Sequence, residues 1–462
     1  MKQLSLLDLV FFMVESEESP KHVAGLMRLQ KPKGCPADYV PRLVEEMKRW
    51  NEVQEPFNLV INFLGLTGPR WEYCRDFTFD NHVFYHRPKR SMSWEETLER
   101  VGLLHEPLLD RSKPLWELHV IDGIRGRKFA AYLKLHHAYA DGVTMTSWMS
   151  KTLAPDPARD SYTPPWAMEP EPRRKSASNG PGLTTSLFKL AGLARNQLKA
   201  ATGIAKIAAQ QAIERTGLTE DAVALYFNTG RDTVMTGSTS PGRNVATASI
   251  PMDRIKRIGK TAYATLNHVA LSCIDGAIHR YLADRGIVLD HPVSIQMPVN
   301  LRGNGDGGSG NKIGITLVDM AEPTDDPYRR LREIGFKLKS VKTQVAGIPA
   351  SAFEQFTVLA AGASEVIDML RLTDYLPTNG HALVSNVPGP RETLFLNESK
   401  VERMYPVSTL SPGLRLNITM FSYAGMLQFG LVSTRDLDDL QSLADYIVSE
   451  FDRLEEAIID RY

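Results

Sequence analysis

The chain has 462 residues, more than one hydrophobic core usually supports, so two domains are expected. Hydrophobic residues make up 43% of the chain and charged residues 23%, the balance of a soluble globular protein. Lys plus Arg and Asp plus Glu both total 54, which argues against a protein whose whole surface coats nucleic acid or an anionic membrane.

The cysteines and the N-terminal stretch bear on the compartment. Cys35, Cys74 and Cys273 are widely spaced and form no CxxC pair. This pattern argues against a disulfide framework or a thiolate zinc site and fits a reducing compartment. The first apolar stretch carries Asp8 and Glu15 and lacks a small-residue cleavage site, so it is not typical of a signal peptide. No run approaches the roughly 18 apolar residues of a membrane span, and we expect a cytoplasmic protein.

Residues 1–153 are predicted to form a first domain that mixes helices and strands. Tyr39–Val53 has apolar residues at helical spacing, which predicts an amphipathic helix. Glu117–Gly123 and Lys128–His137 are typical of two strands joined by a polar turn, and Val143–Leu153 is predicted to be a helix.

Residues 154–235 are predicted to be a linker and a bridging helix. The part from Pro155 to Gly182 is rich in Pro, Gly, Ser and charge. Leu187–Gly217 follows as a long helix whose charges are mostly basic. We expect this helix to pack on the body of the protein with a solvated basic face, and the alternative is a surface helix that touches lipid.

Residues 236–462 are predicted to form the second domain. Its marked elements are a strand, a helix with one apolar stripe, a buried strand and a closing helix, at Asn244–Pro251, Thr265–Gly286, His291–Arg302 and Leu440–Ile459. The glycine-rich loop at residues 303–311 lacks the lysine and the strand–loop–helix setting of a phosphate loop.

The segment HHAYADG at residues 136–142 carries the most specific chemical signal. Side chains alternate along a strand, so two adjacent histidines point to opposite faces and His137 is the better candidate for chemistry than His136. A neutral imidazole at a strand end can remove a proton from an alcohol, amine or water. Gly142 is expected to break the strand because glycine adopts backbone angles that other residues avoid, and Asp141 stands near the start of the next helix.

Two alternatives to a catalytic base remain at this motif. In the first, both histidines are ordinary partly buried residues and Asp141 only caps a helix. In the second, a metal-dependent hydrolase uses His136, His137 and Asp141 as ligands. Strand alternation makes that set awkward, because ligands usually come from one side of an element, and we expect no metal.

Further motifs accompany the histidines. Pro114, Leu115 and Trp116 stand just upstream of the histidine strand, Asn267 near the start of a second-domain helix, and Ser385 and Asn386 before Val-Pro-Gly-Pro. Together with HHxxxDG and the opening stretch from residue 4 to residue 26, they resemble the bacterial wax ester synthase/diacylglycerol acyltransferase family. This family lies within the superfamily of CoA-dependent, chloramphenicol-acetyltransferase-like acyltransferases. The chain departs from the family pattern at His268, where Asp is usual, and at Lys21, where Met is common.

The resemblance implies an α/β fold of two chloramphenicol-acetyltransferase-like domains, each a mixed β-sheet flanked by helices. The active site would lie in a tunnel at their interface, with His137 near its middle as general base. Long-chain acyl-CoA would be a co-substrate, with no cofactor, and a fatty alcohol or diacylglycerol the acceptor. Peripheral contact with a membrane or lipid inclusions would fit these substrates, and no nucleic acid is expected as a partner.

The resemblance also suggests roles for the other motif residues. Asp141 is expected to orient the turn. Asn267 either supplies a polar contact near the reacting centre or satisfies backbone groups at a helix start. Trp116 is expected in the core rather than on a substrate wall. Ser385 and Asn386 are expected to shape a turn at the domain interface, with direct substrate contact the less favoured alternative.

An apolar stretch at residues 346–377, with Gly347 and Ala350, is predicted to line the acceptor channel. Two other functions share the histidine motif. One is a condensation-type acyltransferase that uses carrier-protein thioesters, and the other is a non-catalytic acyl-lipid-binding protein.

Overall fold

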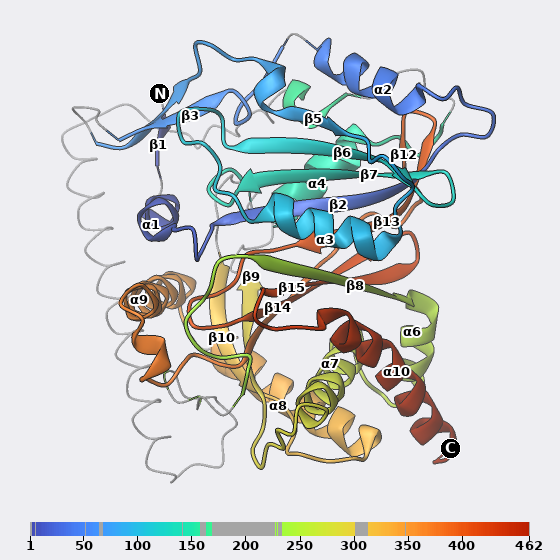
Figure 1. Ribbon diagram of the computed structural model, residues 1–462. Coiled ribbons are helices and arrows are strands. Elements are labelled where there is room, and N and C mark those ends of the chain that lie inside the picture. The colour runs from blue at the N-terminus through green and yellow to red at the C-terminus, as the bar shows by residue number, and fades with distance from the viewer. Residues whose placement is uncertain are drawn as a thin grey trace, which may run out of the picture.

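The structure is a computed structural model that describes residues 2–4, 6–50, 52–63, 68–140, 142–157, 163–168, 227, 229, 233–300, 313–346 and 348–461. Two six-stranded sheets dominate it, and a three-stranded sheet lies at one edge. Figure 1 shows the two large sheets one above the other, with helices on their outer sides and between them. The mixed α/β architecture expected from the sequence is confirmed.

The first large sheet belongs mainly to the N-terminal lobe. Its strand order is β12-β13-β2-β7-β6-β5, and the strands span Phe395–Leu396, Ser399–Val407, His22–Gln30, Lys128–His136, Trp116–Ile124 and Val83–His86. The hairpin predicted upstream of the two histidines is confirmed, because β6 and β7 pair antiparallel. The helices of this lobe are α1, α2, α3 and α4, at Leu6–Val14, Tyr39–Lys48, Trp94–His105 and Gly142–Thr152.

Short elements complete the N-terminal lobe. The three-stranded sheet has the order β1-β4-β3, with strands Lys2–Gln3, Arg70–Tyr73 and Leu59–Asn62. Two single-turn helices, η1 and η2, lie at Phe79–Asn81 and Pro165–Ala167. The amphipathic helix predicted from residue 39 is confirmed as α2, and it ends five residues earlier than predicted, at Lys48.

The second large sheet forms the C-terminal lobe in the order β10-β9-β11-β14-β15-β8. Its strands span Ile313–Asp319, Ser294–Asn300, Ala382–Val387, Leu416–Tyr423, Met426–Thr434 and Arg243–Pro251. Helices α6, α7, α8, α9 and α10 lie at Met252–Thr261, Leu266–Ala283, Pro327–Ala346, Ala350–Met369 and Leu440–Ile459, and η3 at Leu372–Asp374. The four elements predicted for this domain are therefore all present.

One strand pair crosses between the lobes. β12 and β13 come late in the chain, yet β13 pairs antiparallel with β2 of the first sheet, with Met404 opposite Met27. Strands from the C-terminal part of the chain thus complete the sheet of the N-terminal lobe, so this lobe is not formed by one continuous stretch of sequence. The boundaries predicted at residues 153 and 236 stay predictions, and the predicted helix at 187–217 and the loop at 303–311 lie outside the described residues.

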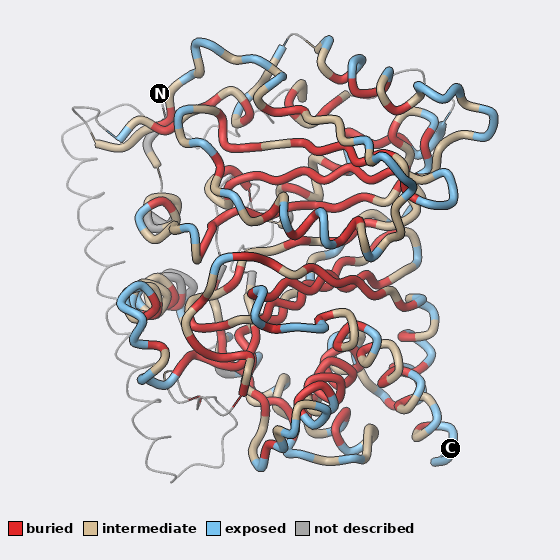
Figure 2. Tube along the Cα trace, viewed as in Figure 1, coloured by how far each residue is buried: buried red, intermediate tan, exposed pale blue. Residues whose placement is uncertain are grey.

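The lobes meet through packed apolar side chains. Leu98 and Val101 of α3 join Val245 of β8, Tyr405 of β13 and Val432 of β15 in one buried cluster. In Figure 2 most of the chain in both large sheets is coloured as buried. Within the described parts of the chain, no helix is both long enough and apolar enough to cross a membrane.

Candidate active site

His137 stands directly after the last residue of β7, where the strand ladder with β2 ends. Its backbone N–H donates to the carbonyl oxygen of Lys21 at 2.8 Å, which extends the ladder by one bond. Its ring packs against Phe11, with the ring centroids 4.8 Å apart and the planes inclined by 30°. The residue is half-buried and lies on the wall of a cavity.

This cavity has a volume of about 350 Å³ and is shared by both lobes. Its wall is mostly apolar. The N-terminal lobe and β13 contribute Phe11, Val23, Gly25, Met145, Met149 and Met404, and the C-terminal lobe contributes Pro298, Ile315, Val358, Ala361, Leu383 and Phe421, among others. A long apolar chain fits such a lining, and His137 supplies a titratable group to it.

His136 has a different environment from its neighbour. It is fully buried, its ring stacks on Phe12 at a centroid distance of 4.2 Å, and it does not line the cavity. Burial lowers the pKa of His136 to about 3, and nearby charges, with His137 first among them, act in the same direction. The backbone N–H of Ala138 donates to His136 Nδ1 at 3.1 Å. His136 is therefore a neutral structural residue whose proton resides on Nε2.

A buried carboxylate that the sequence did not single out lies beside His136. The Glu15 side chain is 1% exposed, and its Oε1 lies 3.5 Å from His136 Nε2. It accepts from Arg111 Nη2 at 3.0 Å and from the backbone N–H of Lys21 at 3.2 Å. The low pKa of His136 means that Glu15 faces a neutral imidazole and forms its ion pair with Arg111. Glu15 thus joins the histidine strand to the residue that receives the His137 N–H.

The Pro-Leu-Trp segment holds the strand end from the other side. The carbonyl oxygen of Leu115 accepts from the His136 N–H at 3.0 Å, and the Leu115 N–H donates to the Tyr139 hydroxyl at 2.9 Å. Pro114 directly precedes this residue and is buried. Trp116 is fully buried and its Nε1–H donates to the Phe57 carbonyl oxygen at 2.9 Å. Trp116 therefore lies in the core, as expected, and not on the cavity wall.

Gly142 lines the cavity and is the first residue of α4. The strand β7 has ended at His136, before this glycine. A Cβ at this position would lie 3.1 Å from Val387 Cγ2 of the opposite lobe. Glycine is needed here because the two lobes approach closely beside the cavity. Asp141 lies outside the described residues.

Asn267 and Asn386 are brought together although 119 residues separate them. Asn386 Nδ2 donates to Asn267 Oδ1 at 2.8 Å, and both side chains are exposed. Asn386 lines the cavity and Asn267 does not. The alternative of Asn267 as a helix-start residue that satisfies backbone groups is wrong, because Thr265 caps α7 and His268 completes the capping box.

Ser385 and Asn386 both lie inside β11, so the prediction that they shape a turn was wrong. The residues that follow the strand, at positions 388–390, form neither helix nor strand. Ser385 Oγ shares a hydrogen bond with Thr419 Oγ1 at 2.8 Å. Ser385, Asn386 and Thr419 all line the cavity. Parallel pairing of β11 with β14 explains this arrangement, since it sets Ser385 opposite Thr419.

The structure describes only part of the stretch at residues 346–377 that was predicted to line the acceptor channel. Gly347 lies outside the described residues, and Ala350 is the first residue of α9, with its side chain outside the described set. Three later residues of α9, Thr357, Val358 and Ala361, line the cavity. The predicted stretch thus contributes to the cavity wall through these three residues, and its role as an acceptor channel stays a prediction.

Two protein-family models match the chain. The wax ester synthase/diacylglycerol acyltransferase catalytic domain matches residues 4–270, and the WS/DGAT C-terminal domain matches residues 309–455. The chain belongs to the wax ester synthase/diacylglycerol acyltransferase (WS/DGAT) family. The resemblance seen in the sequence motifs is therefore confirmed.

Relatives match this WS/DGAT chain along nearly all of its length. "Probable diacyglycerol O-acyltransferase tgs2" of Mycobacterium tuberculosis is 32% identical, with 98% of each chain covered. "O-acyltransferase WSD" of Acinetobacter baylyi is 29% identical, with 99% of this chain and 98% of that one covered. The structure of a wax ester synthase/diacylglycerol acyltransferase from Marinobacter aquaeolei VT8 aligns with a TM-score of 0.76 at 25% identity, over 99% of this chain and 100% of that one.

The fold is also shared outside the WS/DGAT family. The first condensation domain of the CDA synthetase aligns with a TM-score of 0.59 over 99% of this chain and 96% of that one. The two chains are only 13% identical, so this likeness concerns the fold alone. Together with the Marinobacter structure, it confirms the two-lobed fold that the family resemblance implied.

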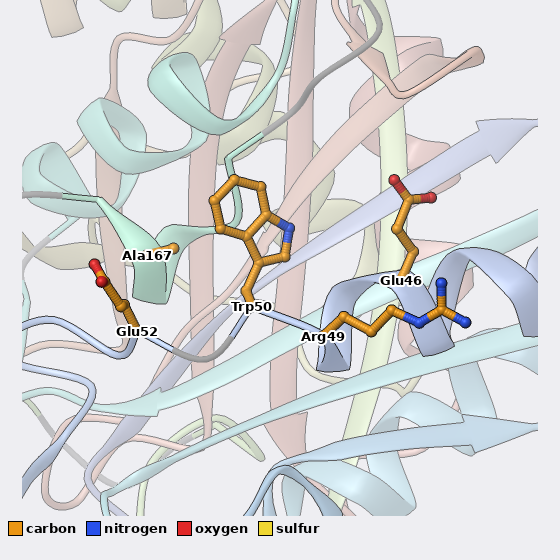
Figure 3. A pocket seen from close by; sticks show the side chains of 5 residues that line it. All are labelled: Glu46, Arg49, Trp50, Glu52 and Ala167. Carbon is orange, nitrogen blue, oxygen red and sulfur yellow. The ribbon is translucent and has the colours of Figure 1, made fainter.

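A second hollow, of about 340 Å³, lies on the outer surface of the N-terminal lobe. Figure 3 shows its lining: Glu46 and Arg49 at the end of α2, Trp50 and Glu52 after it, and Ala167 of η2. None of these residues is buried, and none belongs to the histidine motif or to the cavity shared by the lobes. Over the described ranges, no cluster of three or more His, Cys, Asp or Glu side chains is arranged to hold a metal ion.

Proposed function

We propose that this WS/DGAT protein transfers a long-chain acyl group from acyl-CoA to the hydroxyl of a fatty alcohol or a diacylglycerol. One observation carries the proposal: His137 lies on the wall of a mostly apolar cavity that both lobes share. Family membership and the relatives named as O-acyltransferases support the same reaction. Acyl-CoA is a co-substrate in this account, and no cofactor takes part.

The reaction follows from the chemistry of a thioester and a neutral imidazole. The acceptor hydroxyl gives its proton to His137 while its oxygen bonds to the thioester carbonyl carbon. The tetrahedral intermediate holds its negative charge on the former carbonyl oxygen and collapses as the carbon–sulfur bond breaks. The proton passes from His137 to the departing sulfur, so the products are an ester and CoA thiol. A thioester is already activated, and no acyl-enzyme is needed.

Two effects raise the rate of this reaction. The general base contributes roughly 10²–10⁴-fold, and alignment of the two bound reactants contributes much of the remaining rate enhancement. We assign Asn386 to the alignment of the reactants, because its amide lies on the cavity wall and is oriented by its hydrogen bond to Asn267. In this role Asn267 is a positioning residue, because its own side chain does not line the cavity. Asp141 stays a predicted orienting residue of the turn.

We also propose that the protein contacts a membrane or lipid inclusion through the outer side of α9 and the residues after it. Large apolar side chains are exposed there: Leu359 at 61%, Met369 at 73% and Tyr375 at 76%. The same helix lines the cavity, so a lipid substrate would have a short path inward. Flotation with phosphatidylcholine vesicles tests this, and a double variant, Leu359→Asp with Met369→Asp, should float less. Equal flotation of the variant and the parent protein would contradict the proposal.

The experiment that tests the reaction is thiol release from palmitoyl-CoA, measured with and without hexadecanol or dipalmitoylglycerol, and with product lipids separated by chromatography. The proposal predicts alcohol-dependent release and equal amounts of new ester. Release without an acceptor would indicate a thioesterase. Transfer from a carrier-protein thioester but not from free acyl-CoA would favour a condensation-type enzyme, and tight acyl binding without turnover would favour a lipid-binding protein.

A further inference from the structure

The segment that connects α1 to β2, residues 15–21, is held by both lobes, and we call it the strap. Two of its carbonyl oxygens accept hydrogen bonds from the C-terminal half of the chain. Glu18 O accepts from Arg243 Nη2 at 2.6 Å, and Pro20 O accepts from Thr409 Oγ1 at 2.8 Å. At its end the strap provides Lys21, whose carbonyl oxygen receives the His137 N–H.

The side chain of Lys21 makes the third connection across the lobes. It is 3% exposed, and its Nζ lies 2.6 Å from Glu365 Oε1 of α9 and 2.7 Å from Ser19 Oγ. One residue therefore binds the histidine segment through its backbone and α9 through its side chain. Lys21 also lines the cavity. Figure 1 shows α1, the start of β2 and α9 along the same edge of the molecule.

The partner residue is on the helix that lines the cavity. Glu365 is 11% exposed and lies about one turn beyond Ala361, which lines the cavity together with Thr357 and Val358 of the same helix. Burial raises the pKa of Glu365, Lys21 opposes this shift, and Asp368 of the same helix adds to it. A buried ion pair contributes little net stability, because desolvation of both charges offsets their attraction. A role in fixing geometry accounts better for the pair.

We propose that the Lys21–Glu365 ion pair is a clamp that sets the position of α9, and hence of the bound substrates, relative to His137. The inference deepens the proposed function and rests on it for its kinetic consequences. Both residues are positioning residues, since they act on His137 and on the cavity wall through other groups.

The kinetic test compares Lys21→Met, Glu365→Gln and the double variant with the parent protein. Lys21→Met leaves Glu365 buried without its cation, so we expect kcat at pH 8 to fall about tenfold while KM for acyl-CoA changes by less than about twofold. Glu365→Gln and the double variant also lack the ion pair, so their kcat should fall to about the same level, because all three changes remove one shared interaction.

Lys31→Met is the matched control. Lys31 follows the other end of β2 and pairs with the buried Asp122 at 2.5 Å, far from the cavity. The Lys31→Met variant should therefore have the same kcat as the parent protein. A double variant with the kcat of the parent protein would overturn the clamp, because the single variants would then be slow only through an unpaired buried charge. Equal rates for Lys21→Met and the parent protein would overturn it as well.

Amide hydrogen exchange tests the clamp independently of turnover. In Lys21→Met we expect faster exchange in residues 15–22 and in α9, with unchanged exchange in α10. If the parent protein shows no acyl transfer, the proposed function fails while this measurement still decides the clamp. Unchanged exchange in both segments would overturn the clamp even if the acyltransferase activity is present.

Discussion

Replacement of Glu15 by Gln should destabilise the protein measurably. The substitution keeps the size of the side chain and removes the charge that faces Arg111 Nη2 at 3.0 Å. Loss of a hydrogen bond between charged groups costs roughly 1.5–3 kcal/mol. Arg111 is 38% exposed and also donates to Phe12 O, so water and the remaining bond reduce the cost to about 1–2 kcal/mol.

Urea unfolding of the parent protein and the Glu15→Gln variant at pH 7.5 measures this cost as a shift of the midpoint. Glu17→Gln is the control, because Glu17 is exposed and lies in the same segment. The kcat should also fall, since Glu15 accepts the Lys21 N–H and so fixes the strap that receives the His137 N–H. If Glu15→Gln unfolds at the same urea concentration as Glu17→Gln, the assignment of Glu15 as a structural centre is incorrect.

Three further predictions concern the cavity and the buried histidines. Gly142→Ala should lower stability by about 1 kcal/mol, because its Cβ would lie 3.1 Å from Val387 Cγ2; thermal unfolding would show this, and Val387→Ala should relieve it. Ala361→Phe should narrow the cavity and lower the rate with hexadecanol relative to butanol, and an unchanged ratio of the two rates would exclude Ala361 from the acceptor path. His136 keeps a pKa of about 3 in the folded protein against 6.5 for an ordinary imidazole, so between these values the unfolded chain binds the proton and stability falls as pH decreases. The loss reaches about 2 kcal/mol at pH 5. The buried His22 and His105 also have lowered pKa values, so they too make the folded protein less stable as the pH falls. Burial raises the pKa of Asp275 to about 7, and this group has the opposite effect on stability. Urea midpoints at pH 7 and 5 should therefore differ, and equal midpoints would refute the assignment.

Local patterns predicted much of the fold. Short runs rich in aromatic and aliphatic residues located β6 and β7, and the apolar stripe of α7 located that helix to within a few residues. The alternation of side chains along a strand distinguished His137 from His136, because two adjacent side chains point to opposite faces of the sheet. Such features depend on residues close in sequence, and the periodicities of helix and strand are sufficient to detect them.

Long-range contacts could not be predicted in this way. Pairing of β13 with β2 joins residues that are at least 370 positions apart in the sequence, and no local pattern encodes its register. Glu15 and Glu365 looked like ordinary charged residues in the sequence, since their importance comes from burial against Arg111 and Lys21. Gly142 was recognised, but its reason is the proximity of Val387, which only the assembled lobes reveal.

The most direct test of the central claim is the rate of thiol release from palmitoyl-CoA with hexadecanol in the His137→Ala variant. Loss of a general base predicts a decrease of roughly 10²–10⁴-fold in kcat, with little change in the urea midpoint. His86→Ala is the control, because His86 is a half-buried histidine on β5, away from the cavity. A His137→Ala variant that stays within about threefold of the parent rate would contradict the account, because acyl transfer would then proceed without this imidazole.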